Sequence, residues 1–178
     1  PGNGQYACSN LSGERLYVMS SDGGPGSPGT AHHLSAFRID WALKRLEPLG
    51  TPTSLRHRPI HITTDRDSSH ALIAYNSPST VTVHELAANG AVNDEVAQPD
   101  DLDTGIFAHQ MYVARSNRTA ILVTRGYDAS STTPEQPGAL KVFDYAGGRL
   151  TDRASIAPIC GYGFGPRNVD VHRSVLGL

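Results

Sequence analysis

The sequence predicts an all-β protein arranged as part of a β-propeller, and two observations carry this prediction. First, 18 glycines and 12 prolines separate short runs rich in Val, Ile, Leu, Tyr and Thr, a pattern typical of many short strands joined by turns. Second, the order of these runs repeats, with similar strands beginning at residues 15, 70 and 119. A repeat of about 40 to 50 residues that holds four short strands is typical of a propeller blade.

Each repeat contains the same parts in the same order. The similar strands are RLYVMSS (15–21), HALIAYN (70–76) and TAILVTR (119–125). A loop rich in Gly, Ser and Pro leads from each to a second alternating strand, namely HLSAFRID (33–40), STVTVHEL (79–86) and GALKVFDY (138–145). A turn and a further short segment close each repeat: LKRLEPLG, GAVNDEVAQ and GRLTDRASI. We therefore expect one partial propeller domain over residues 1–178, with blade units at about 5–56, 57–106 and 107–164, and the start of another blade at 165–178.

Polar residues stand at the start of each blade's first strand. The segments RPIHITTDRDSSH, AHQMYVARSNRT and GPRNVDVHRS align so that Ile60, His109 and Arg167 share one position. The next position holds His61, Gln110 and Asn168, and a position at the end of the following strand holds Asn76 and Arg125. First strands line the central channel of a propeller, so residues at their starts converge on one mouth. The sequence thus predicts a polar site there.

Several of these segments resemble one known family. HQMYVARSNRTAILVTRG, PGALKVFDYAGGRLTDRASIAP and GYGFGPRNVDVHR are similar to the lactonase family of seven-bladed β-propellers. That family includes bacterial cytoplasmic 6-phosphogluconolactonase and fungal 3-carboxy-cis,cis-muconate lactonizing enzyme. RPIHITTDRDSSHALIAYNSPSTVTVHELAANG fits an earlier blade. The resemblance runs from about Gln5 to Val171 and implies that the chain covers roughly three to four of seven blades.

The resemblance also implies roles for the site residues. His109 matches a histidine of the family's site, and Arg167 matches the arginine of its G-P-R-H motif. Asn168 replaces the histidine of that motif, and Leu178 precedes the strand that carries the family's glutamate. His109 and Arg167 are the expected catalytic residues, and the expected substrate-binding residues are Arg125, His61, Gln110 and Asn168.

These residue types suit acid–base chemistry on an anion. Histidine exchanges protons near neutral pH, and arginine holds carboxylate or phosphate through paired hydrogen bonds. The implied activity is a lactone hydrolase of the 6-phosphogluconolactonase type, acting on a small anionic lactone. Two alternatives stay open: a cycloisomerase that closes a lactone on a 3-carboxymuconate dicarboxylate, and a binding module without catalysis. The absent glutamate and Asn168 favour the last of these for the isolated chain.

Other classes of partner find no support in the sequence. A net charge of −2 without a basic block gives no reason to expect nucleic acid or an anionic membrane as partner. Cys8 and Cys160 fit no metal motif, and GPGSPG (24–29) is followed by a strand rather than the helix of a dinucleotide site. We expect no metal and no cofactor.

Two further expectations concern location and assembly. No apolar run reaches the roughly 20 residues of a membrane span, and PGNGQYACSN lacks the features of a secretory signal. Either the start of the chain has been removed or the protein is cytoplasmic, and the cytoplasm is the expected location. If the chain ends at Leu178, an arc of three or four blades leaves an apolar face at each end. Such faces predict a homo-oligomer.

Overall fold

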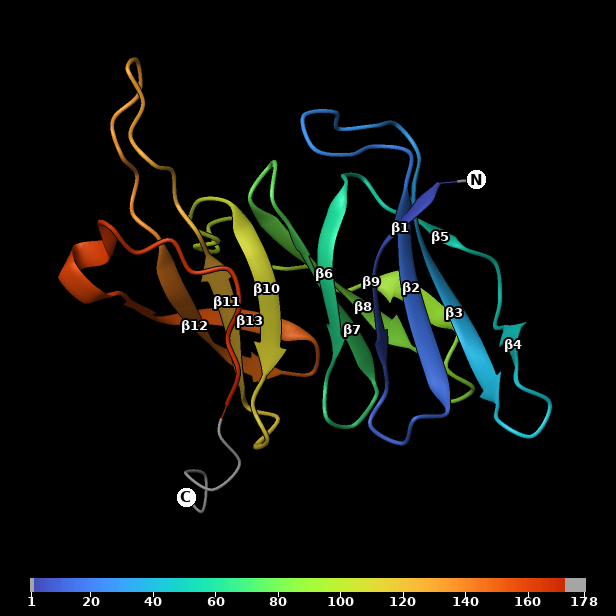
Figure 1. The fold of residues 1–178 in the computed structure, drawn as a ribbon. Coiled ribbons are helices and arrows are strands. Elements are labelled where there is room, and N and C mark those ends of the chain that lie inside the picture. Colours follow the sequence, from blue (N-terminus) through green and yellow to red (C-terminus); the bar gives the residue numbers. More distant parts are fainter. Residues whose placement is uncertain (1, 172–178) are drawn as a thin grey trace.

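The structure, a computed structural model, describes residues 2–171 as three antiparallel sheets placed side by side in an arc (Figure 1). Each sheet is one blade, and its strands follow the order of the sequence. Blade 1 contains β1 (Asn3–Ser9), β2 (Arg15–Ser21), β3 (His32–Asp40) and β4 (Arg45–Pro48), with β5 (Thr53–Ser54) paired to β3. Blade 2 contains β6 (Pro59–Thr64), β7 (His70–Tyr75), β8 (Thr80–Leu86) and β9 (Val92–Glu95). Blade 3 contains β10 (Ala108–Val113), β11 (Thr119–Thr124), β12 (Ala139–Ala146) and β13 (Arg149–Ile156).

The predicted all-β propeller fold is confirmed. Within residues 2–171 the only helical element is a short 3₁₀ turn, η1 (Pro158–Gly161). The strands expected from the repeat are present, with ends that differ by about one residue. The sequence reading missed β1, whose polar, mostly exposed residues lack the apolar alternation that marks the other strands.

The segment expected to begin another blade is described only in part. Residues 165–171 contain no strand, and in Figure 1 they run down beside β10. Residues 172–178 lie outside the described part of the chain.

The central blade packs on both sides, and β7 shows why its sequence is almost continuously apolar. Ala71, Ile73 and Tyr75 join the core shared with blade 1. Leu72 and Ala74, which alternate with them and so face the opposite way, join the core shared with blade 3. Because both faces of this strand are buried, the run HALIAY has no polar face.

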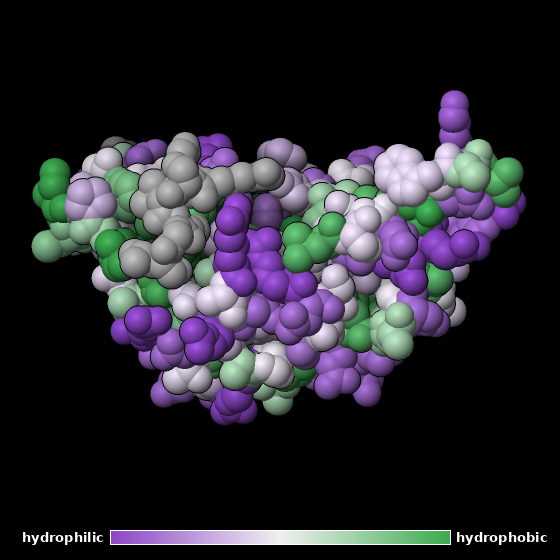
Figure 2. Space-filling view, turned by 90° about the horizontal axis from the view of Figure 1, so that it is seen from below, coloured by the Kyte–Doolittle hydropathy of each residue, from purple (hydrophilic) through white to green (hydrophobic). Residues whose placement is uncertain are grey.

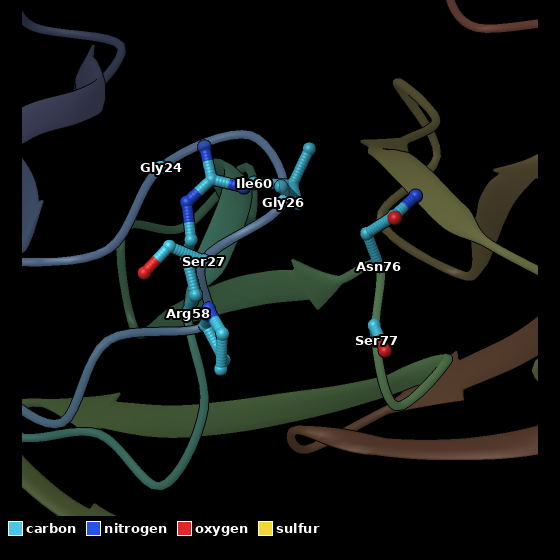
Figure 3. Close-up of a pocket in the computed structure, with 8 residues that line it drawn as sticks. Gly24, Gly26, Ser27, Arg58, Ile60, Asn76 and Ser77 are labelled. Carbon is cyan, nitrogen blue, oxygen red and sulfur yellow. The ribbon is translucent and has the colours of Figure 1, made fainter.

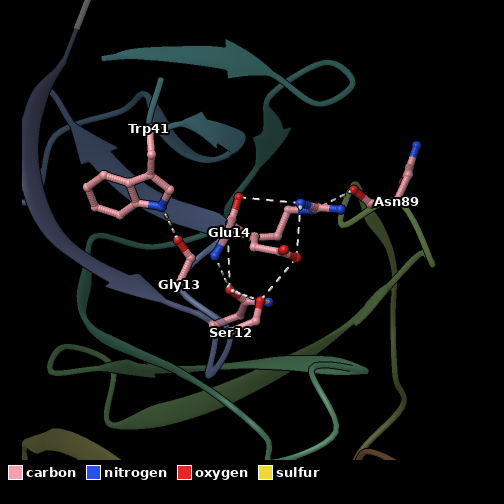
Figure 4. Close-up of polar contacts among 7 residues, drawn as sticks. Ser12, Gly13, Glu14, Trp41 and Asn89 are labelled. Atoms are coloured by element: carbon pink, nitrogen blue, oxygen red, sulfur yellow. Dashed lines mark hydrogen bonds and ion pairs between the residues drawn. The ribbon is translucent and has the colours of Figure 1, made fainter. Parts of the chain in front are cut away.

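A side-chain network closes the β1–β2 turn and ties blade 1 to blade 2 (Figure 4). The Asn10 side-chain oxygen accepts hydrogen bonds from the backbone N–H groups of Glu14 and Arg15, at 3.1 and 3.0 Å. Arg15 Nε donates to the Asn89 carbonyl in blade 2 at 2.9 Å. Trp41 Nε1 donates to the Gly13 carbonyl at 3.0 Å, which fixes the turn against its own blade.

The connections between strands are short at one end of the blades, whereas the long loops lie at the other (Figure 1). The end that carries the short β1–β2, β6–β7 and β10–β11 turns is seen in Figure 2, where hydrophilic residues predominate and hydrophobic ones form separate spots. The opposite end carries the long β2–β3 and β11–β12 loops, which project from the top in Figure 1. Among the described residues there is no helix with the length and hydropathy needed to cross a membrane.

Candidate active site at the channel mouth

An irregularity recurs at the start of the first strand in every blade. The strand register shifts between Gly4 and Tyr6 in β1, between Pro59 and His61 in β6, and between Ala108 and Gln110 in β10. The residues left out of register are Gln5, Ile60 and His109. A bulge of this kind re-aims a side chain and is common next to active sites. Ile60 and His109 therefore occupy equivalent positions in their blades, as the repeat predicted. Gln5 occupies the same position in blade 1, and the sequence analysis did not include it.

The residues that follow the second strand of each blade lie at the same end. Ser20, Tyr75 and Thr124 each pair with the residue before the bulge, so Ser21, Asn76 and Arg125 occupy equivalent places. First strands begin and second strands end at the top in Figure 1. This antiparallel arrangement brings the bulged residues and Ser21, Asn76 and Arg125 to one mouth.

His109 is half-buried, with both predicted arginines close by. Its Nδ1 is buried and has no hydrogen-bond partner among residues 2–171. Burial lowers the pKa of the ring; the Arg167 backbone opposes this, and the positive charges of Arg167 and Arg125 add to it. His109 is consequently neutral near pH 7 and able to accept a proton.

Arg125 is held in place by aromatic rings. Its guanidinium carbon lies 4.6 Å from the centroid of the Phe107 ring, a cation–π contact. The Phe107 ring meets the Tyr127 ring edge-on, with centroids 4.4 Å apart. Sequence reasoning missed both aromatic residues, although their positions one residue before β10 and two residues after Arg125 place them beside the predicted site.

His61 lies beside the cluster but is almost covered. It is 7% exposed, its ring centroid is 4.4 Å from that of Tyr6, and its Nδ1 has no partner among the described residues. Burial, with the nearby His109 second, lowers its pKa to about 4. The sequence predicts that His61 contacts the substrate, but little of its side-chain surface is exposed for such a contact.

The remaining two predicted residues have different surroundings. The Gln110 amide is engaged with the backbone of Val169, donating to its carbonyl at 3.2 Å and accepting from its N–H at 2.6 Å. Gln110 therefore holds the segment that carries Arg167. Asn168 is exposed, and no side-chain hydrogen bond joins it to the described residues around His109.

The geometry thus combines a neutral histidine with two arginines. Such a group can take a proton from water and stabilise negative charge on a nearby oxygen. Within residues 2–171, no group of three or more His, Cys, Asp or Glu side chains is placed to hold a metal ion.

Several solved structures share this fold. The chain is 16% identical to the periplasmic gluconolactonase PpgL of Pseudomonas aeruginosa, with a TM-score of 0.53, covering 87% of this chain and 58% of that one. A candidate 6-phosphogluconolactonase from Bacteroides uniformis gives 16% identity and a TM-score of 0.51, covering 88% and 58%. Hydrazine synthase of Kuenenia stuttgartiensis gives 13% identity and a TM-score of 0.60, covering 92% and 37%.

At these identities the comparisons show similarity of fold only. The chain spans less than two thirds of the length of each of these neighbours. No curated protein sequence matches the chain significantly. The family comparison is more specific, because the family described as lactonase, seven-bladed β-propeller, matches residues 1–174. With its three blades, its bulged first strands and this match over nearly its whole length, the chain belongs to the lactonase family of seven-bladed β-propellers.

Proposed function

We propose that the protein containing this chain is a lactonase that hydrolyses a small sugar-acid lactone of the gluconolactone type. The observation that carries the proposal is the bulge at His109 near the start of β10, with Arg125 directly after β11 at the same end of the blade; the positive charges of Arg167 and Arg125 also contribute to the lowered pKa of His109. Family membership supports the proposal, as do the gluconolactonase and 6-phosphogluconolactonase names of the neighbours from Pseudomonas and Bacteroides. We propose 6-phosphogluconolactone as the preferred substrate, because two arginines at the mouth favour an anion.

The proposed reaction uses His109 as both base and acid. Neutral His109 removes a proton from a water molecule as its oxygen attacks the lactone carbonyl, and Arg167 and Arg125 stabilise the oxyanion that forms. When the tetrahedral intermediate collapses, the ring C–O bond breaks. The proton on His109 passes to the departing ring oxygen, so the product is the open hydroxy acid.

Turnover of purified protein tests this function. His109→Asn should lower kcat/KM by about 10²- to 10⁴-fold, the usual range for loss of a general acid–base group. Since the base must be unprotonated, wild-type activity should fall with decreasing pH only below the ordinary histidine pKa. His33→Asn, in β3 away from the cluster, is the matched control and should keep wild-type turnover.

Other results would reject or redirect the proposal. Full turnover by His109→Asn would contradict the assigned role, and a wild-type rate equal to spontaneous hydrolysis would contradict lactonase activity. Conversion of 3-carboxy-cis,cis-muconate, followed by ultraviolet absorbance, would instead assign the lactone-forming reaction, whose substrate also carries carboxylates for the arginines. Binding of these compounds without turnover would identify a binding module.

We also propose a cytoplasmic location for the reaction. Cys8 and Cys160 are free thiols, a form that the reducing cytoplasm maintains. The neighbour PpgL is described as periplasmic, so fractionation of cells that express the native gene is the direct test. Recovery with periplasmic markers would contradict this proposal.

A further inference from the structure

A pocket opens between blade 1 and blade 2, at the same end of the strands as His109. Its volume is about 310 Å³, and its lining comes from the β2–β3 loop, from the start of blade 2 and from the end of β7: Gly24, Gly26, Ser27, Pro28, Arg58, Ile60, Asn76 and Ser77. Ile60 and Asn76 occupy the places in blade 2 that His109 and Arg125 occupy in blade 3. The pocket therefore adjoins the His109 site without sharing its side chains.

Among the described residues that line the pocket, Arg58 alone carries a charge. Its Nε is buried and has no hydrogen-bond partner among residues 2–171, and no carboxylate lines the pocket. Leaving a buried donor of a charged group unpaired is costly unless a ligand or water satisfies it. A guanidinium without an acidic partner in a concave site is suited to a planar or tetrahedral oxyanion.

Neutral hydrogen-bonding groups also line the pocket. Figure 3 shows Arg58 and Ser27 on one side of the pocket and Asn76 and Ser77 on the other. Two hydroxyl groups and an amide can donate hydrogen bonds to an anion without bringing a competing negative charge. The lining thus has the composition of an anion site built from three separate segments.

The loop that forms one wall is held rigidly. Gly24 and Ser27 exchange two backbone hydrogen bonds, at 2.8 and 3.0 Å. Asp22 Oδ1 accepts from the backbone N–H groups of Thr30 and Ala31, at 2.7 and 2.9 Å. These bonds, led by that from Ala31, lower the Asp22 pKa to about 2, so this carboxylate stays ionised and bound to its own loop.

We propose that the pocket around Arg58 binds the anionic group of the substrate at the end remote from the lactone carbonyl. The proposal rests on the proposed function in placing that carbonyl at His109. The shared chemistry is an oxyanion, either a phosphate monoester or a carboxylate. Ile60, which lines the pocket, and His109 hold the equivalent bulged positions at the starts of the neighbouring strands β6 and β10, and the proposed substrate extends from one to the other.

Calorimetric titration with inorganic phosphate, acetate, gluconate and 6-phosphogluconate tests the site directly. Arg58→Gln should weaken binding of phosphate and 6-phosphogluconate by about tenfold or more, as expected for loss of a charged hydrogen-bonding partner. The matched control is Arg115→Gln, which removes the same charge from an exposed turn at the opposite end of the strands. It should bind each anion as the wild type does.

The titrations also distinguish the two kinds of oxyanion. Tighter binding of phosphate than of acetate, and of 6-phosphogluconate than of gluconate, identifies a phosphate site. Tighter binding of acetate than of phosphate, with gluconate and 6-phosphogluconate bound alike through the carboxylate that both carry, identifies a carboxylate site. Equal phosphate binding by wild type and Arg58→Gln would overturn the proposal, whichever anion binds more tightly.

A second variant tests the wall without touching the charge. A Cβ on Gly29, where φ is +73°, would lie 2.4 Å from Asp22 Oδ1 and from the Gly23 nitrogen. Gly29→Ala should therefore displace the loop and weaken phosphate binding. Gly13→Ala adds a Cβ at a similar φ of +70° with no atom within 4 Å, and should leave binding unchanged. Equal phosphate binding by Gly29→Ala and Gly13→Ala would contradict a preformed wall.

The proposed function and the Arg58 site can fail separately. His109→Asn should lose turnover but keep phosphate binding, because the imidazole does not line the Arg58 pocket. Loss of phosphate binding in Arg58→Gln, together with wild-type protein that turns over no lactone, would sustain the anion site and reject the lactonase. Normal turnover with unchanged KM and phosphate binding in Arg58→Gln would reject the site alone.

Discussion

Burial separates the roles of two neighbouring histidines. His61 and His109 stand in successive positions of adjoining blades, yet His61 is nearly covered by its surroundings, whereas His109 is half-buried. Desolvation disfavours the charged imidazolium in both rings and leads the causes that lower each pKa. Only His109 combines a neutral ring with enough exposed surface to meet a substrate.

The buried neutral state of His61 predicts a pH-dependent stability. Its pKa is about 4 in the folded protein, against an ordinary value of 6.5 for a solvated histidine, so between these values the unfolded chain binds a proton that the folded chain does not. The free energy of unfolding should therefore fall as pH decreases, on the order of 2 kcal/mol from this group between pH 7 and pH 5. Urea unfolding of wild type and His61→Gln at both pH values measures it. An identical pH dependence in the two proteins would contradict this assignment.

In blades 1 and 2, a side chain closes the turn that follows the first strand. In blade 2 this side chain also forms a hydrogen bond with blade 3. Asp65 Oδ1 accepts from the backbone N–H groups of Ser69 and His70. Asp65 Oδ2 accepts from His70 Nδ1 at 2.9 Å and from the Tyr145 hydroxyl at 3.0 Å. Asn10 closes the corresponding turn of blade 1, but Ala114 stands at this place in blade 3. Asp65 is thus a single side chain that closes its own turn and also bonds to the next blade.

Removing the Tyr145 hydroxyl should loosen the contact between blades 2 and 3. Burial, followed by the charge of Asp65, raises the Tyr145 pKa, so the hydroxyl stays protonated and donates. Tyr145→Phe leaves a buried carboxylate with one donor fewer, which should cost about 1.5 to 3 kcal/mol of unfolding free energy. The control Tyr162→Phe removes a hydroxyl from an exposed ring and should change stability little. Equal urea midpoints for the two variants would argue against the interblade bond.

On the scale of the whole molecule, the arc covers blade 2 on both faces but blades 1 and 3 on only one. The uncovered face of blade 1 carries half-buried Leu16, Val18 and Phe37. That of blade 3 carries half-buried Ile121 and Val142, which pair across β11 and β12. In a propeller such faces are covered by further blades.

The polypeptide of residues 1–178, expressed alone, should therefore associate through these faces. Light scattering after size exclusion should give a mass above the 19.0 kDa of one chain. Val18→Lys and Ile121→Lys place a charge on each outer face and should shift the mass toward the monomer. A monodisperse monomer of the unmodified polypeptide would show that the outer faces tolerate water, contrary to this prediction.

The amino-acid sequence alone determined the repeat and most of the strands. It also determined that the polar site residues lie at the same end of the blades. These features depend on local properties: alternation of apolar residues along a strand, and turn residues between strands. The repeated order then placed Ile60 and His109 at one position, and the register confirms this. The same alignment placed Arg167 at that position too, and the family resemblance added the catalytic roles expected of His109 and Arg167.

Only the tertiary structure decided how the side chains are used. A bulge depends on pairing with the next strand, so Gln5 joined the set of equivalent residues only when the register was known. Gln110 was expected to bind substrate, but its amide meets Val169, 59 residues away along the chain. Nothing in the sequence singled out Arg58, and only the fold places it in a pocket with the β2–β3 loop and the end of β7. Burial and the meeting of charges are properties of segments distant in sequence, and packing sets them.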